Sequence, residues 1–385
     1  MYYEVGFWMC LGLIVYIYIG YPVCVFLLSA ISGHRPNSSP LEPTVTVVIS
    51  AYNEEAEIEM TVINKLNQDY PPDRLKVVVV SDGSTDRTEM IVQRLQRDHP
   101  HRLMLLRQEP RQGKTQALNM AFQHLSSEVV VFADANSIYA SDATRALVNN
   151  FSDPSVGYVT GHMIYGNPGS TGIGVGSSSY MSYENALRTW ESNIGSIVGV
   201  DGGIDAIRRQ CYRPMRPDQL PDFILPLSVV EQGKRVVYEP RAMVFETALA
   251  DPFQEFRMRV RVSLRAMWGL YDKKHLLNPF RFHLFAWQLM SHKVLRYGAF
   301  LPLAGLLFLN ILAVNRDAFY AWSLGVQVSM YAVAMLGHFM RQSSWIEAKL
   351  LSPYYFVILN AACILAFWKF VTGQKMILWK PRLGG

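Results

Sequence analysis

Short runs of β-branched residues alternate with amphipathic segments between Thr44 and about Phe245, and this alternation constrains the fold of the chain most strongly. The strand-like runs are VTVVIS, KVVVVS, RLMLLR and EVVVFA, and the helix-like segments that separate or follow them are EEAEIEMTVINKLNQ, TDRTEMIVQRLQRD, TQALNMAFQHL and DATRALVNNF. Strands that alternate with helices form parallel sheets joined by right-handed crossovers. The sequence therefore predicts an α/β fold with a Rossmann-like, mostly parallel sheet covered by helices.

Apolar runs flank this α/β region on both sides. The first, Gly6–Ile31, is long enough to cross a bilayer, and Gly20, Tyr21 and Pro22 within it predict a kink. No basic residue precedes this run, so a transmembrane signal anchor fits it better than a cleaved signal peptide. Three further apolar runs lie at 298–314, 318–337 and 353–371.

Basic residues indicate the side of the membrane on which the α/β region lies. His34 and Arg35 follow the first apolar run, and a group of Lys and Arg residues between 257 and 296 precedes the later ones. Because cytoplasmic segments are enriched in Lys and Arg, we expect a multi-pass protein of the inner (cell) membrane with a cytoplasmic α/β domain that contacts membrane lipid. The formal net charge is only +5 and no motif for reading bases is present, so we expect no nucleic-acid partner.

These patterns predict four parts: an N-terminal signal anchor at 1–34, an α/β domain at 42–250, amphipathic interfacial helices at 251–296 and a transmembrane region at 297–385. Three crossings after the α/β domain would place the C-terminus outside, whereas Lys369, Lys375, Lys380 and Arg382 favour the inside. Two explanations stay open. Either one run is re-entrant, with Pro353 and Asn360 marking the last run as the candidate, or the number of spans is different.

A stretch of small and turn-forming residues, GNPGSTGIGVGSSS at 166–179, predicts a loop before a helix at 180–193. A lid over the site and an ordinary connection are both compatible with this composition.

Three aspartates follow the strand-like runs. Asp82 lies in VVVVSDGSTD, Asp134 in VVVFADANS and Asp222 in LPDFILPLSVVEQGKRVVYEP. Open α/β sheets bind ligands beyond the carboxyl ends of their strands, so acidic groups gathered there favour a shared metal and phosphate site. Each aspartate could instead be a turn former or a residue at a helix start.

An ordered set of motifs over about residues 44–300 resembles the glycosyltransferase family 2 enzymes of GT-A fold, in particular the membrane-bound group that builds bacterial exopolysaccharides. The set comprises VVISAYNEEAEI, VVVVSDGSTDRT, RQGKTQALNMAF, VVVFADANS, GVDGGIDAIRR and the Asp222 segment. Each motif alone is weak, whereas the ordered set in one chain is specific.

The resemblance implies a role for each of several residues. The nucleotide pocket is implied to be lined by Asp82, Tyr52, Asn53 and Glu54. Lys114 is implied to contact a phosphate or a base carbonyl, and Asp134 and Asn136 to hold Mg²⁺ or Mn²⁺. The resemblance further implies that Asp222 is the general base. A divalent cation held by oxygen ligands and shared with phosphate suits the charge that develops on a departing diphosphate. A solvated lysine is the plain alternative for Lys114.

The chain departs from the family pattern at two places. Asn136 stands where a second aspartate is usual, and an amide oxygen binds a cation more weakly than a carboxylate; Asn136 could also be a simple turn residue. Processive relatives carry Gln-x-x-Arg-Trp, whereas this chain has Met258, Arg259, Val260, Arg261 and Val262. Arg261 is expected at the diphosphate, with a lipid headgroup as its competing partner.

The resemblance implies an inverting, metal-dependent hexosyltransferase that uses a nucleotide sugar, most simply a UDP-sugar, and extends an exopolysaccharide at the cytoplasmic membrane face. Two alternatives stay open. One is single transfer to a polyprenyl-linked or other lipid-linked acceptor, and the other is a catalytically weak scaffold that associates with proteins of a polysaccharide secretion complex.

Overall fold

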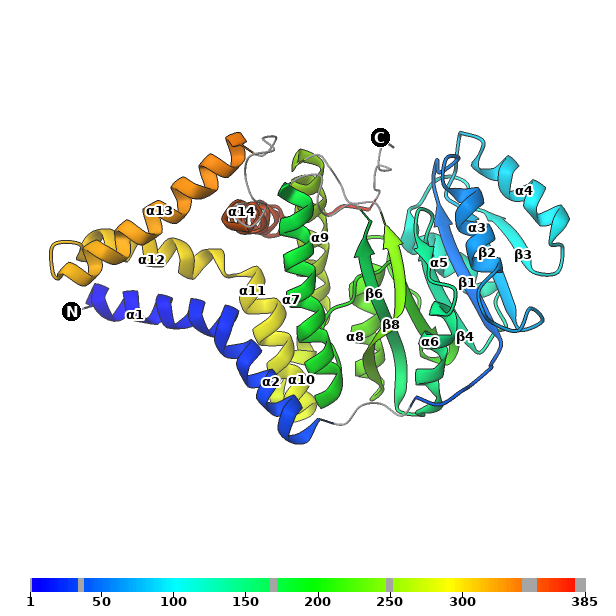
Figure 1. Cartoon of the computed structure of the whole chain (residues 1–385), viewed down its shortest axis with the longest axis horizontal. Coiled ribbons are helices and arrows are strands. Elements are labelled where there is room, and N and C mark those ends of the chain that lie inside the picture. The colour runs from blue at the N-terminus through cyan, green and yellow to red at the C-terminus, as the bar shows by residue number, and fades with distance from the viewer. Residues whose placement is uncertain (1, 34–37, 167–171, 247–251, 341–351, 378–385) are drawn as a thin grey trace. The chain divides into compact units, whose positions relative to one another are not determined.

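The computed structural model describes the whole chain except residues 1, 34–37, 167–171, 247–251, 341–351 and 378–385 (Figure 1). The chain divides into two compact units. The α/β unit contains Gly33–Gly166, Glu191–Glu246 and Lys375–Gly385, and the helical unit contains Met1–Ser32, Asn167–Trp190 and Thr247–Gln374.

One sheet of eight strands forms the centre of the α/β unit, in the order β3-β2-β1-β4-β7-β6-β8-β5. The strands are β1 Val45–Ala51, β2 Leu75–Ser81, β3 Leu103–Arg107, β4 Val129–Asp134, β5 Ile138–Tyr139, β6 Val156–Tyr165, β7 Ile204–Arg208 and β8 Arg235–Glu246. Strands β1 to β4 are all paired in parallel, as predicted.

The second half of the sheet is mixed, which the prediction of a mostly parallel sheet did not include. Strand β7 is antiparallel to both β4 and β6, β8 is parallel to β6, and β5 is antiparallel to β8. The chain between β6 and β7 leaves the α/β unit at residue 167 and returns at residue 191. Because residues 167–190 belong to the helical unit, β6 and β7 are not joined by a crossover helix of the α/β unit, and their pairing need not be parallel.

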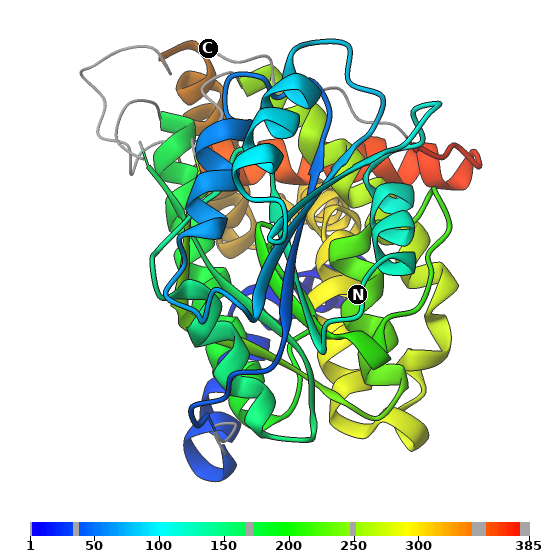
Figure 2. The same ribbon diagram turned by 90° about the vertical axis from the view of Figure 1, so that its right-hand side faces the viewer.

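Helices cover both faces of the sheet (Figure 2). They are α3 Ile58–Leu66, α4 Thr88–Asp98, α5 Lys114–Gln123, α6 Ala143–Asn149 and α8 Pro221–Glu231. Helices α3, α4 and α6 fall within predicted helical segments, and α5 begins one residue before its predicted segment. Helices α5 and α8 pack in one core cluster with Val48, Val80 and Phe132. Val47, Val77 and Val131 alternate with these residues toward the opposite face and are fully buried, at about 1.5–3 kcal/mol per side chain.

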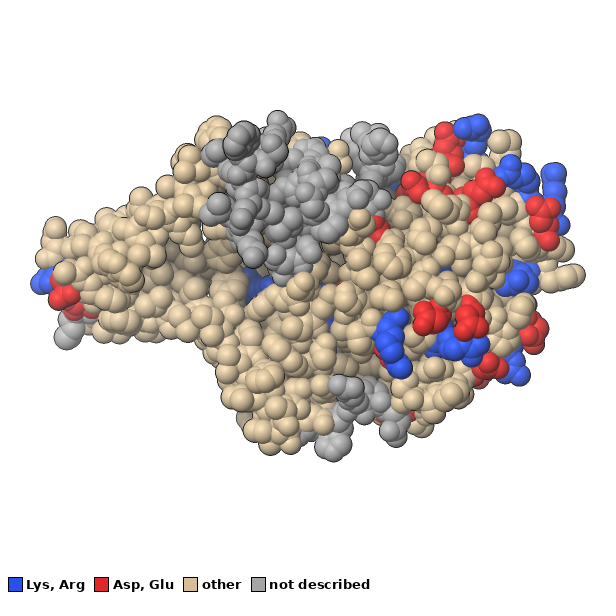
Figure 3. All heavy atoms as spheres, viewed as in Figure 1, with Lys and Arg blue, Asp and Glu red and all other residues tan. Residues whose placement is uncertain are grey.

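The helical unit is built from longer, more apolar helices. They are α1 Tyr2–Val15, a π-helical turn at Tyr16–Gly20, α2 Tyr21–Ser32, α7 Gly172–Ile194, α9 Pro252–Asp272, α10 Pro279–Leu289, α11 Leu295–Tyr297, α12 Phe300–Ala313, α13 Ala318–Met340 and α14 Ser352–Val371. Within the described residues, three helical stretches are long and apolar enough to cross a membrane: Tyr2–Ile31, Ala318–Phe339 and Pro353–Val371. On the face seen in Figure 3, this unit carries few charged side chains, whereas Lys, Arg, Asp and Glu are scattered over the α/β unit.

The predicted kink in the first apolar run is confirmed, because a π-helical turn at Tyr16–Gly20 separates α1 from α2. Pro22 at the start of α2 cannot donate a backbone hydrogen bond to the preceding turn, which explains why the irregularity falls there.

Of the two open alternatives, a re-entrant last run is not supported by Pro353 and Asn360. Helix α14 is continuous, since Pro353 lies in its first turn, where proline is tolerated, and Asn360 donates to the carbonyl of Phe356 within the helix. The break falls earlier: Pro279–Tyr297 and Phe300–Ala313 meet at 57° and form a fourth candidate span only if the bent pair is taken as one.

The predicted loop at 166–179 is shorter than expected. Helix α7 begins at Gly172, so residues 172–179 are helical, and residues 167–171 lie outside the described part of the chain. Gly and Ser disfavour a helix interior by less than about 1 kcal/mol each, and a long continuing helix can absorb that cost.

Helix α9 lies in the segment 251–296 that was predicted to form amphipathic interfacial helices, and it carries an apolar stripe that includes Phe253, Leu264, Met267 and Tyr271. Leu264 and Met267 from its middle pack in one cluster with Ala366 of α14, whereas Phe253 and Tyr271 near its two ends are exposed. Part of the stripe therefore serves helix packing inside this unit.

Candidate active site

The carboxyl ends of the parallel strands bring the predicted site residues to one edge of the sheet. In the strand register, Ala51 lies beside Ser81, Ser81 beside Arg107 and Ser50 beside Asp134. The loops that follow these strands carry Tyr52, Asp82, Lys114 and Asn136. The fold therefore gathers side chains that are more than 80 residues apart in sequence.

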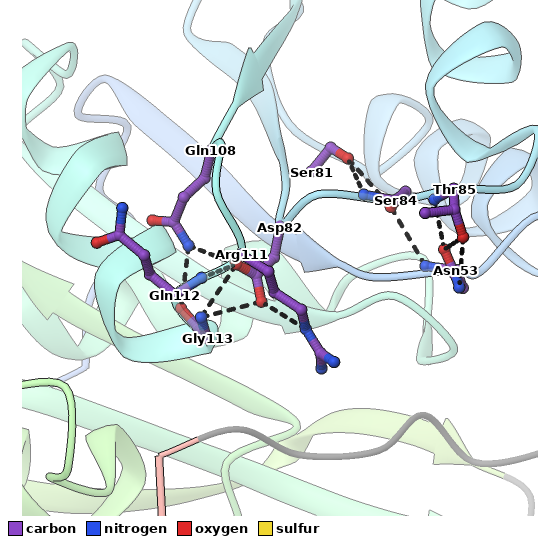
Figure 4. Close-up of polar contacts among 9 residues, drawn as sticks. All are labelled: Asn53, Ser81, Asp82, Ser84, Thr85, Gln108, Arg111, Gln112 and Gly113. Atoms are coloured by element: carbon purple, nitrogen blue, oxygen red, sulfur yellow. Dashed lines mark hydrogen bonds and ion pairs between the residues drawn. The ribbon is translucent and has the colours of Figure 1, made fainter.

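Asp82 is fully buried, and its carboxylate organises the loop after β3 (Figure 4). It accepts hydrogen bonds from Gln108 Nε2 at 2.6 Å, from the backbone N–H of Gln112 at 2.8 Å and from that of Gly113 at 3.0 Å. Arg111 Nε lies 3.4 Å from its other oxygen. Because these donors already engage the Asp82 carboxylate, the structure shows it as the anchor of the segment 108–113, and its predicted nucleotide contact stays a prediction.

Tyr52, Asn53 and Glu54 join the loop after β1 to the loop after β2. The Asn53 side chain accepts from the backbone N–H of Thr85 at 2.8 Å, and the backbone N–H of Glu54 donates to Thr88 Oγ1 at 2.9 Å. Asn53 has a φ of 54°, a conformation that Asn adopts more easily than most residues. The Arg111 guanidinium stacks over the Tyr52 ring at 3.4 Å from its centroid, so all three loops are locked together.

Lys114 lies between two of the predicted carboxylates. Its Nζ is 2.7 Å from Asp134 Oδ1 and 3.7 Å from Asp222 Oδ1. Burial alone would lower the pKa of Lys114, but the charges of Asp134 and Asp222 outweigh it, and its pKa stays above the ordinary lysine value. Lys114 is the first residue of α5, where a cation is disfavoured by the helix dipole, and the two carboxylates offset this effect.

The donor set near Asp134 fits a divalent cation only in part. Asp134 ends β4 with its side chain about one third exposed, and Asn136 lies in the turn that follows. Across the described ranges, no three His, Cys, Asp or Glu side chains are grouped so that they could hold a metal ion. One carboxylate and one amide suit Mg²⁺ or Mn²⁺ if phosphate oxygens of a bound substrate supply further ligands.

Asp222 lies in the first turn of α8, after Pro221, and the loop before β7 packs closely against it. Gly202 in this loop has a φ of 86°, and a Cβ atom at this position would lie 2.5 Å from the Asp222 carboxyl carbon. Only glycine allows the backbone to approach the carboxylate this closely.

Helix α3 supports the turn after Asp134 through a lysine that the sequence analysis did not single out. Lys65 is fully buried, its Nζ donates to the carbonyl of Ser137 at 2.5 Å, and it lies 3.7 Å from the centroid of the Tyr139 ring. Burial lowers its pKa to about 7, although the charges of Glu246 and Asp134 act in the opposite direction. A lysine on the apolar face of a predicted helix was the available signal.

Asp205 on β7 is the second residue that sequence reasoning missed, although the segment GVDGGIDAIRR contains it. It is fully buried close to Asp222 and Lys114, since the charges of both influence its pKa. A single carboxylate within the apolar strand Ile204–Arg208 could have drawn attention to it.

Arg261 lies on α9 of the helical unit and is partly exposed. Its predicted contact with a diphosphate stays a prediction.

The comparisons with known proteins agree with the fold. Residues 46–212, which include Asp82, Lys114, Asp134 and Asp205, match the sequence model of Glycosyl transferase family 2. A poly-beta-1,6-N-acetyl-D-glucosamine synthase of Staphylococcus epidermidis is 24% identical over 352 residues, which cover 86% of this chain and 84% of that protein. The synthase of the same name from Staphylococcus aureus strain COL is 25% identical over 204 residues, which cover 52% of this chain and 48% of that protein.

A solved structure extends the likeness of fold to nearly the whole chain. The mannosyltransferase PcManGT from Pyrobaculum calidifontis, in complex with GDP-Man and Mn²⁺, superposes with a TM-score of 0.72 at 23% identity and covers 95% of this chain and 99% of its own. The architecture is therefore that of a GT-A glycosyltransferase. Residues 46–212 therefore form a glycosyltransferase family 2 domain, and the protein is a glycosyltransferase.

We predict that Asp82→Asn loosens the segment 108–113. The new amide would keep one oxygen for Gln108, Gln112 and Gly113, but it would lose the negative charge and turn an NH2 group toward Arg111 Nε and the Gly113 N–H, so the free energy of unfolding should fall by about 1–3 kcal/mol. The KM for the donor should rise, because Lys114 directly follows this segment. Denaturant unfolding and steady-state kinetics measure the two effects. The matched control is Asp98→Asn at the exposed end of α4. Equal stability of the two variants would refute the anchoring role.

We predict that Gly202→Ala displaces Asp222. The added methyl group would overlap the carboxyl group and strain the backbone, so kcat should fall by at least about tenfold, whereas the donor KM should change less. Gly195→Ala is the control, because its added Cβ has no heavy atom within 4 Å. Both variants should first be shown to have an unchanged unfolding temperature. If they then have the same kcat, the explanation is refuted.

Proposed function

We propose that this glycosyltransferase transfers a hexosyl unit from a nucleotide sugar, specifically a UDP-sugar, to a growing exopolysaccharide at the cytoplasmic face of the cell membrane. The observation that carries the proposal is the cluster of Lys114, Asp134 and Asp222 at the carboxyl edge of the parallel strands. The names of the staphylococcal relatives support a polysaccharide product, and the complex of PcManGT with GDP-Man and Mn²⁺ supports a nucleotide-sugar donor and a divalent cation.

Each residue of the cluster has a distinct task in this proposal. Asp222 accepts the proton of the acceptor hydroxyl, whose oxygen forms the new bond to the anomeric carbon while the bond from that carbon to the diphosphate breaks on the opposite side. Lys114 stabilises the negative charge on the departing diphosphate. Asp134, with Asn136, would hold Mg²⁺ or Mn²⁺, which supplies further stabilisation of that charge when bound.

The remaining loops complete the donor site. Asp82 keeps the segment that leads to Lys114 in place, and the stacked pair of Tyr52 and Arg111 offers an aromatic and a cationic surface for the nucleotide. The candidate spans of the helical unit support a multi-pass membrane protein with this domain on the basic, cytoplasmic side. Arg261 of α9 contributes a cation toward the diphosphate in the same proposal.

Single transfer to a lipid-linked acceptor is the second candidate function. Val262 stands where processive relatives carry Trp, and a β-branched side chain offers a sugar ring less contact area than an indole. Short products would favour this candidate over repeated extension.

The purified full-length protein in lipid nanodiscs provides the direct test. It is incubated with radiolabelled UDP-N-acetylglucosamine, UDP-glucose, UDP-galactose and GDP-mannose, each with Mg²⁺, with Mn²⁺ or with excess chelator, and the products are sized. We expect transfer from a UDP-sugar that requires the metal ion, and loss of transfer in Asp134→Ala. Undiminished transfer in chelator would reject the metal requirement, and transfer from GDP-mannose alone would reject the UDP donor.

Asp222→Asn should lower kcat by about a hundredfold or more, the usual contribution of a general base, and leave donor affinity near that of the wild type. The amide preserves the shape of the side chain but does not accept the proton. Calorimetric donor binding and single-turnover kinetics separate the two effects. If binding and turnover fall by the same factor, Asp222 positions the donor and another group is the base.

A further inference from the structure

Asp205 is a carboxylic acid in a strand that is otherwise part of the core. Its exposed fraction is 0%, and it lies on the same face of β7 as Ile207, which packs with α5 and α8. Helices α5 and α8 begin with Lys114 and with Pro221 and Asp222, respectively, so Asp205 points from the sheet toward the candidate active site.

No hydrogen bond of normal geometry reaches either carboxyl oxygen of Asp205 within the described part of the chain, although the hydroxyls of Thr160 and Tyr158 lie close enough to interact with it. Thr160 is its cross-strand neighbour on β6, and the Thr160 hydroxyl is also buried without a partner there. An ionised carboxylate that is buried without donors is unfavourable by several kcal/mol in general, so such groups usually hold a proton instead.

Two of the three nearby charges also favour the protonated form of Asp205. Asp222 on α8 and Asp201 in the loop before β7 repel a negative charge on it, and Lys114 on α5 is the cation that attracts one. Lys114, however, already lies 2.7 Å from Asp134 and 3.7 Å from Asp222. Tyr158 on β6 and Tyr139 on β5 also face Asp205, and burial keeps the pKa of both hydroxyls well above the ordinary value, so they stay neutral.

Asp222 differs from Asp205 in its exposure to water and in its proximity to a cation. Its side chain is about one quarter exposed, and the Lys114 ammonium lies beside it. Of two interacting carboxyl groups, the one that is better solvated and closer to a cation keeps the negative charge. The geometry therefore favours Asp205 as the protonated residue and Asp222 as the ionised one.

We propose that Asp205 keeps the proton of an Asp205–Asp222 carboxyl pair and so leaves Asp222 as the ionised member that takes the acceptor proton. This inference rests on the proposed role of Asp222 as the base. Asp205 acts through Asp222 and Lys114, and it is thus a positioning residue that sets the charge of the site. Burial, followed by the charge of Asp222, raises the pKa of Asp205 to about 8, in agreement with this assignment.

The raised pKa fixes the direction of the pH effects. Below about 8, Asp205 is neutral and Lys114 offsets one of the two negative charges of Asp134 and Asp222. Above it, a further negative charge enters the site and opposes binding of the anionic donor. The stability of the fold decreases over the same range: an aspartate in the unfolded chain ionises near the ordinary value of 3.8, whereas Asp205 in the folded protein stays neutral up to about 8. The contribution of the neutral form to stability is therefore fully present below 3.8 and is lost as pH rises to about 8.

Infrared spectroscopy of the full-length protein in nanodiscs tests where the proton is. The difference spectrum between wild type and Asp205→Asn should contain the C=O stretch of a protonated carboxylic acid at pH 6, and this band should disappear as pH rises through about 8. In Asp222→Asn the band should persist but titrate at lower pH, because the repelling charge is gone. Absence of the band from the difference spectrum at pH 6 overturns the proposal.

The pH dependence of the donor KM and of the unfolding temperature provides a second test. If Asp205 had only a structural role, its replacement would not change either pH dependence. The donor KM of the wild type should rise by roughly tenfold per pH unit above pH 8, and this rise should be absent in Asp205→Asn and retained in Asp201→Asn. As pH rises from 4 to 8, the unfolding temperature of Asp205→Asn should increase relative to that of the wild type. Parallel pH profiles of wild type and Asp205→Asn overturn the proposal. Should Asp205→Asn fail to fold, Asp205→Ser, which also lacks the carboxyl group, replaces it in every measurement.

The two ideas fail in different ways. If Asp222→Asn retains full transfer while the Asp205 band behaves as expected, the base is elsewhere and the charge assignment stands. If Asp222→Asn abolishes transfer while Asp205→Asn leaves the spectrum unchanged, the base role stands and the proton belongs to another group.

Discussion

The buried carboxylate of Asp82 holds the geometry of the candidate site together. It binds two backbone N–H groups, one side-chain amide and one guanidinium of the segment 108–113, and Lys114 follows directly. A charged acceptor with several donors is stable in a buried position, and the low local dielectric strengthens each of these bonds. The position of the Lys114 ammonium therefore depends on an aspartate that precedes it by 32 residues.

Charge balance is the second constraint on the site. Asp134, Asp222 and Asp205 all converge on Lys114, which is the cation that the described residues place among them. Full ionisation of three carboxylates beside one ammonium would leave net negative charge where, in the proposed function, an anionic diphosphate binds. Neutralisation of the most buried carboxyl group resolves this conflict without any loss of side-chain shape.

The helical unit obeys a different constraint, since its candidate spans expose many large apolar side chains. Its candidate spans keep most of their side chains at the surface, as expected for helices that face lipid. Charged groups inside it are paired, as for Glu255 with Arg259 and for Glu184 with Arg296. Such pairing is the usual way to hold charges away from water.

The sequence by itself determined the parallel half of the sheet, the helices between its strands, the kink before Pro22, and the presence of Asp82, Lys114, Asp134 and Asp222 at the edge of the sheet. These features follow from local periodicity and from the rule that parallel strands end at the same edge. The mixed second half, the early start of α7 at Gly172 and the continuity of α14 depended on tertiary structure, because they are decided by contacts between distant segments. The same is true of the buried partners: the loop that engages Asp82, the location of Lys65 under the turn after Asp134, and the isolation of Asp205 arise where distant strands and helices meet. Local sequence does not determine how many hydrogen-bond donors surround a buried side chain once water is excluded. The tertiary structure alone decided that number.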